Sequence, residues 1–106
     1  MTNLEALIAE LEPYTASPLA YSKRLADHGV VETDAYTADN KRNIGLAALD
    51  LLVAMLPLSS DSTGRSSQGY SLEGLEKRIK RLCEELGLDP AEFIPEPQVL
   101  VYPNLF

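Results

Sequence analysis

The run "IGLAALDLLVAMLPL", Ile44 to Leu58, constrains the fold more than any other part of the chain. It is apolar on almost every side of a helix, whereas a helix on the surface of a globular protein keeps one wet face. We therefore expect a helix that begins between residues 34 and 39, ends at Pro57, and is central in its domain or shared with neighbouring subunits. The run is too short to cross a bilayer, and Asp50 and Pro57 interrupt it. Small residues within it let other helices approach closely: Gly45, Ala47, Ala48 and Ala54.

Two shorter helices are expected before this run. The first covers about residues 3–12, because Thr2 and Glu5 fit a capping box and Pro13 stops the helical pattern. Apolar residues at the spacing of one helical face define its inner side: Leu4, Leu7, Ile8 and Leu11.

The second short helix is expected over about residues 18–28. Ser17 is a good N-cap, Pro18 suits the first helical position, and Gly29 lies just past the predicted end. We expect three residues to face the core: Leu19, either Tyr21 or Ser22, and Leu25.

A last main helix is predicted from Ser71, its N-cap, to the stop at Gly87. Its apolar residues are spaced 3, 4, 3 and 4 apart: Leu72, Leu75, Ile79, Leu82 and Leu86. Asp89 and Pro90 then open one further helical turn, as an N-cap followed by proline at the first position.

These elements predict an all-α protein, a small bundle of four main helices. With 106 residues the chain has material for one core, so we expect one helical domain over 1–94, with a long polar loop at 58–71, and an extended apolar tail over 95–106. Three prolines forbid a helix in that tail.

The polar stretch "SSDSTGRSSQGYS", Ser59 to Ser71, is longer than the two to eight residues that usually connect helices. Part of it imitates a phosphate-binding loop, but Tyr70 stands where the lysine is needed and no strand precedes it. Two interpretations of this stretch remain: a flexible linker, or a loop that becomes ordered only when it contacts a partner. The contact residues in the second case would be Arg65, Gln68, Gly69 and Tyr70.

Charge and cysteine content narrow the class of partner. The chain contains nine Lys and Arg residues and sixteen Asp and Glu residues, which gives a net charge of −7. Nucleic acid and anionic membranes are therefore repelled at long range. The single Cys83 excludes a disulfide within the chain, and the opening segment lacks the basic region of a signal peptide. We therefore expect a cytoplasmic protein that does not bind nucleic acid directly in a sequence-specific way and does not bind membranes.

No catalytic, metal or cofactor site is predicted. His28 is interpreted as a partner for the dipole at a helix C-terminus, and Cys83 as a small buried hydrophobic residue. One Cys and one His are too few for a structural zinc site, and a Cys–His catalytic pair has no further support. The basic run "KRIKR", Lys77 to Arg81, has acidic neighbours and is interpreted as a solvated helix face.

Asp50 stands between two leucines in the apolar helix. Burial without a partner would cost several kcal/mol or protonate it. Either Asp50 marks the one wetted stripe of that helix, or it meets Arg65 or the 77–81 cluster across a subunit contact.

The tail "VLVYPNLF" carries six large apolar residues: Val99, Leu100, Val101, Tyr102, Leu105 and Phe106. In water they would form a patch larger than soluble monomers usually expose, so the tail must dock on its own core or on a neighbour. Of these six, Val99, Val101, Tyr102, Leu105 and Phe106 are predicted contact residues.

The order of segments resembles the small all-helical head–tail connector (adaptor) proteins of tailed bacteriophages and prophages. The matching segments are "LEALIAELEPY", "SPLAYSKRLADHGV", "NKRNIGLAALDLLVAML" and the polar "SSQGYS" before a final helix, a pattern that covers residues 1–86. Such proteins often carry a "GGxS"-like element, which here reads Gln68-Gly69-Tyr70-Ser71 and lacks one glycine.

The resemblance implies a non-enzymatic structural subunit of a ring, a virion component that assembles with itself and with portal or tail proteins. The loop would contact adjacent subunits or the portal, and the tail would clasp a neighbour. The alternative is a small helical interaction or regulatory module that binds one protein partner through Leu72–Leu86.

Overall fold

The computed structural model describes residues 1–61 and 72–94 and is all-α, as predicted. The described residues form four α-helices: α1 (Asn3–Leu11), α2 (Pro18–Asp27), α3 (Lys41–Asp61) and α4 (Leu72–Leu86). Two 3₁₀ turns accompany them, η1 (Ala38–Asn40) before α3 and η2 (Pro90–Glu92) after α4. This part of the chain contains no strand, apart from an isolated bridge between Thr2 and Ala35.

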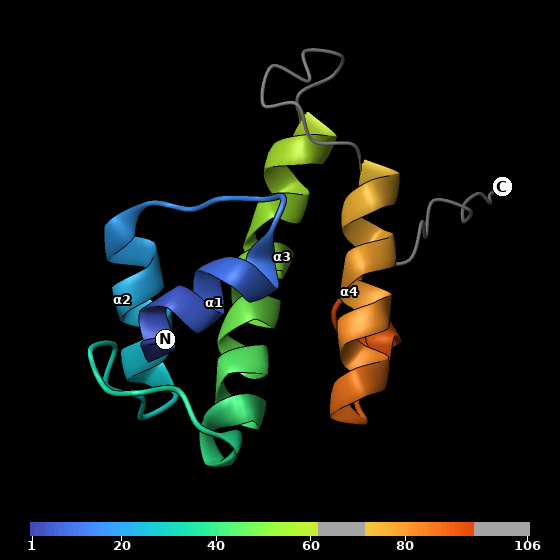
Figure 1. Cartoon of the computed structure of the whole chain (residues 1–106). Helices are drawn as coiled ribbons and strands as arrows, with labels where there is room; N and C mark the ends of the chain where they lie inside the picture. Colours follow the sequence, from blue (N-terminus) through green and yellow to red (C-terminus); the bar gives the residue numbers. More distant parts are fainter. Residues whose placement is uncertain (62–71, 95–106) are drawn as a thin grey trace, which may run out of the picture.

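Helix α3 is the centre of the described body, and α1, α2 and α4 all pack against it (Figure 1). Its buried side chains point in several directions: Ile44, Ala47, Ala48, Leu49, Leu51, Leu52, Met55 and Leu56. Each neighbour buries a narrower stripe, such as Leu75, Ile79 and Leu82 of α4. Helix α3 is central in its own domain, which is one of the two positions expected for it.

Local signals fix the starts of the first two helices as predicted. In α1 the Glu5 backbone N–H donates to the Thr2 hydroxyl at 3.1 Å, and the Thr2 N–H donates to the Glu5 carboxylate at 2.8 Å. In α2 the Ala20 N–H donates to the Ser17 hydroxyl at 3.1 Å. Each cap satisfies backbone donors that have no partner inside the helix.

Two glycines end helices in the left-handed conformation that other residues rarely adopt. Gly29 follows α2 with φ of 71°, and Gly87 follows α4 with φ of 76°. After α2, the Val30 N–H donates to the Leu25 carbonyl and the Gly29 N–H to Ala26. This is the Schellman arrangement, which satisfies the last carbonyls of a helix.

The predicted end of the central helix was wrong. Helix α3 passes through Pro57 and continues to Asp61, so residues 58–61 are helical and do not belong to the polar loop. Proline lacks an N–H and costs about 3 kcal/mol inside a helix, but its fixed φ is helical. The densely buried turns before it hold the helix. At the other end, helical structure begins at Ala38 as η1, and α3 itself begins at Lys41.

Leu19 is a second correction, because its side chain is 82% exposed instead of facing the core. The inner face of α2 comprises Tyr21 and Leu25, one helical turn apart. Leu19 precedes Tyr21 by two residues and thus lies about 200° around the helix. The choice between Tyr21 and Ser22 is settled by burial: Tyr21 is buried, and its hydroxyl accepts the Ala16 N–H at 3.1 Å.

Asn3 is a polar residue that is only 1% exposed, and the sequence pattern did not identify it as buried. Its side-chain amide donates to the Val31 carbonyl at 2.8 Å and accepts from the Asn40 amide at 3.2 Å. Its backbone N–H donates to the Asp34 carbonyl at 2.9 Å. Asn3 therefore joins the start of α1 to the segment that leads into α3.

We predict that Ala48→Leu lowers the free energy of unfolding by about 1–3 kcal/mol, because a larger side chain must enter a site with no free space. Ala54→Leu is the matched control: position 54 is exposed on the same helix, and its effect should stay within about 0.5 kcal/mol. Urea unfolding followed by circular dichroism measures both. Equal effects would contradict the close packing of α3.

Candidate functional site

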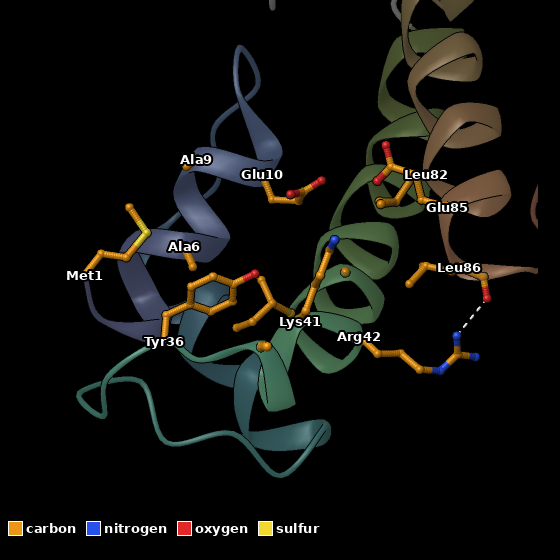
Figure 2. A pocket seen from close by; sticks show the side chains of 13 residues that line it. Met1, Ala6, Ala9, Glu10, Tyr36, Lys41, Arg42, Leu82, Glu85 and Leu86 are labelled. Atoms are coloured by element: carbon orange, nitrogen blue, oxygen red, sulfur yellow. Dashed lines mark hydrogen bonds between the residues drawn. The ribbon is translucent and has the colours of Figure 1, made fainter.

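An open groove of about 630 Å³ lies over α3, between α1 and α4 (Figure 2). Ala6, Ala9 and Glu10 of α1 form one wall, and Leu82, Glu85 and Leu86 of α4 form the other. The floor is the first turn of α3, and Met1, Tyr36 and Ala38 complete the lining. The groove exists because both helices pack on α3 but diverge from each other around its first turns.

The floor of the groove depends on Gly45. A Cβ at this position would lie 3.0 Å from the Leu86 Cδ2 atom, tighter than nine in ten real Cβ contacts. Glycine therefore lets Leu86 lie against the α3 backbone. Ile44, next to it, is buried and gives the floor its apolar character.

Two arginines join the walls and floor of the groove. Arg78 of α4 donates to the Glu10 backbone carbonyl and lies 3.3 Å from the Glu10 carboxylate, which links α4 to α1. Arg42 of α3 donates to the Leu86 carbonyl at 2.7 Å and satisfies a free carbonyl at the end of α4 (Figure 2). Both arginines thus stabilise the arrangement that holds the groove open.

The remaining charges at the groove are Glu85 and Lys41. Glu85 faces Arg81 on its own helix, at 3.8 Å. Lys41 has no ion pair or hydrogen-bond partner for its amine within residues 1–61 and 72–94, and Figure 2 shows this amine between the two walls. The groove therefore combines an apolar floor with one uncommitted positive charge.

The basic run at 77–81 is only partly the solvated face that was predicted. The Lys77 and Arg81 side chains are well exposed and pair with glutamates one turn away. The Arg78 side chain is 21% exposed and reaches Glu10, 68 residues away in sequence. Position 78 lies three residues after Leu75 and four before Leu82, which is the one sequence signal that could have revealed its inward face.

Asp50 lies on the wetted stripe of α3, as one of the two interpretations predicted; its side chain is 36% exposed. Its partner is His28, whose Nε2 lies 2.7 Å from the Asp50 Oδ2. His28 caps the end of α2, so the pair ties α2 to the middle of α3. The 77–81 cluster does not pair with Asp50 in the described part of the chain, and no sequence pattern indicated that His28 would be the partner of Asp50.

Cys83 is fully buried in α4. Burial raises the pKa of its thiol above the usual value, and the negative charges of Asp89 and Glu92 raise that pKa further. A catalytic cysteine needs the opposite, a lowered pKa and an exposed thiolate. The local environment of Cys83 therefore suits the small core residue that was predicted.

The other predicted contact residues lie outside the described residues. They are Arg65, Gln68, Gly69 and Tyr70 of the loop, and Val99, Val101, Tyr102, Leu105 and Phe106 of the tail. Among the described residues, no group of three His, Cys, Asp or Glu side chains could hold a metal ion. The helices there include none with the length and apolar character needed to span a membrane.

The fold and the groove define a small all-α protein with an apolar surface site. The chain belongs to a protein family described as a family of unknown function, DUF6706, whose model matches residues 1–101. No curated protein and no solved structure matches the chain.

We predict that Cys83 makes stability fall at alkaline pH. Since the pKa of the buried thiol is raised, the unfolded chain loses this proton first, and unfolding becomes more favourable above about pH 8.5. The Cys83→Ala variant lacks this contribution. The difference in unfolding free energy between the native chain and the variant should therefore shrink between about pH 8 and pH 10. A difference that stays constant with pH in urea unfolding would contradict the effect.

Proposed function

We propose that the chain is a non-enzymatic structural subunit of a phage or prophage head–tail connector ring. It acts by self-association and by contact with portal and tail proteins. The observation that carries the proposal is the order of helices: α1, α2, α3 and α4 occupy the segments on which the sequence resemblance rests. The ring and its partners follow from that resemblance.

Two apolar features outside the core, the groove and the tail, support an assembly role. Helix α3 is enclosed by α1, α2 and α4 of its own chain, so the body completes its core without a neighbour. A ring of identical subunits needs two different complementary surfaces on each copy. The groove between α1 and α4 supplies one apolar surface, and the sequence of the tail supplies a second one.

The net charge of −7 is compatible with a ring through which DNA passes. A negatively charged wall repels the phosphate backbone, so DNA would slide through without binding. The subunit would assemble in the host cytoplasm and remain as a virion component.

The alternative, an interaction module that uses Leu72–Leu86, is less well supported. Three apolar residues of that helix, Leu75, Ile79 and Leu82, are buried in the core of the chain itself. A partner could contact them only after α4 left α3, which would expose the core to water. Leu72, which is 40% exposed, is the main apolar residue of this stripe left for a partner.

We predict that the native chain forms multi-subunit species as its concentration rises, or when portal protein is added. Size-exclusion chromatography with light scattering measures the mass. The double variant Val99→Asp/Val101→Asp should lose this association, because two charges would replace apolar contacts. Circular dichroism should show that its helices remain.

The matched control is Leu19→Asp/Val31→Asp, which changes two exposed apolar residues of the body instead. It should assemble like the native chain. A native chain that stays strictly monomeric at high concentration, alone and with portal protein, would overturn the proposed function.

A further inference from the structure

We propose that the groove between α1 and α4 binds the apolar part, residues 99–106, of the tail of a second copy of this chain. The inference rests on the proposed function and deepens it by naming the two surfaces that meet. It is argued from the shape and charge of the groove, the sequence of the tail, and the position at which the described chain ends.

The groove is suited to an extended apolar segment. Its volume of about 630 Å³ falls within the range of binding pockets in proteins. Alanines at positions 6 and 9 keep the α1 wall low, and Leu82 and Leu86 make the opposite wall apolar. Arg78 of α4 contacts Glu10 of α1, and this contact sets the spacing of the two walls within a single chain.

The tail has the chemistry that such a groove requires. Prolines at 95, 97 and 103 are incompatible with a helix, and an extended segment would direct neighbouring side chains to opposite sides. Extended segments in grooves gain specificity from alternate side chains. The tail also carries one acidic residue, Glu96, which precedes the apolar part and complements the uncommitted amine of Lys41.

The end of the described chain favours a second copy over the same copy. After α4 the chain passes close to Cys83, since the charges of Asp89 and Glu92 act on the Cys83 thiol. Position 78, whose arginine contacts Glu10 of α1, lies about 140° around α4 from position 83, and the groove lies on the α1 side.

The length of the intervening segment leaves almost no slack for the same copy. Residues 94 and 99 are five Cα steps apart, which reach at most about 18 Å when fully extended. Half the circumference of a helix about 10–12 Å across is about 17 Å. The groove of the same chain therefore receives the apolar part only if residues 94–99 run fully extended around α4, whereas a groove on another copy sets no such requirement. A contact of this kind uses two different surfaces and so builds rings or filaments.

Disulfide trapping between two variants of the full-length chain tests the inference. One variant carries Ala9→Cys in the groove wall, and the other carries Val101→Cys and an affinity tag that gives the mixed dimer its own mass. The native Cys83 is buried and stays unreactive. The control replaces Ala9→Cys by Ala26→Cys, since Ala26 is also exposed near the C-terminal end of a helix. Under mild oxidation, the mixed dimer from positions 9 and 101 should exceed that from 26 and 101 at least tenfold.

The outcomes separate this inference from the proposed function. If the native chain assembles but both pairs give equal yields, the tail–groove contact is wrong and the connector proposal stands. If the double variant Ala9→Cys/Val101→Cys closes within single chains at dilution while the mixture gives no mixed dimer, the second-copy occupant is wrong. If the native chain does not assemble even with portal protein, the proposed function fails and this inference fails with it.

A second variant does not depend on cysteine chemistry. Ala9→Glu places a charge at the rim of the groove and should weaken self-association at least tenfold in sedimentation experiments, whereas Ala26→Glu should leave it unchanged. Unchanged helicity in both variants shows that folding is intact. Equal association of both variants would overturn the inference.

Discussion

The close packing of α3 is the constraint on which the rest of the structure depends. Ala47 and Ala48 are inaccessible to solvent, and the small side chains let α1, α2 and α4 approach one helix from different sides. Since burial of apolar surface is the main favourable term in folding, this one segment organises the body. It also defines the groove. Because α1 and α4 each pack on α3, their contact positions on α3 determine the distance between them. At Gly45 the absence of a side chain brings Leu86 onto the floor.

Features that depend on neighbouring residues could be predicted from the sequence. The capping box of Thr2 and Glu5, the Ser17 cap and the left-handed glycines after α2 and α4 all involve groups within a few residues of one another. The same holds for the helical spacing that buried Leu75, Ile79 and Leu82. Such local signals are sufficient for the number, order and approximate bounds of the helices, and so for the fold class.

Features that depend on distant residues could not be predicted. Arg78 and Glu10 are 68 residues apart, and His28 and Asp50 are 22 apart, so neither pair leaves a pattern in the sequence. In the sequence, Asn3 resembles an ordinary residue of a first helical turn, and only the structure shows its hydrogen bond to the Val31 carbonyl. The predictions for Leu19 and Pro57 were wrong for a related reason. Which side of α2 faces α3, and whether packing outweighs a proline, are decided by the tertiary structure.

The groove gives the connector proposal a physical form. A body with a complete core, an open apolar groove and an apolar tail has the parts of a subunit that extends one segment into the next copy. The most direct measurement is hydrogen–deuterium exchange of the native chain at concentrations below and above self-association. The account predicts slower exchange above it in residues 1–10, 36–45 and 99–106, with α2 unchanged. Equal exchange of these segments at both concentrations, with assembly confirmed in the same sample, would contradict it.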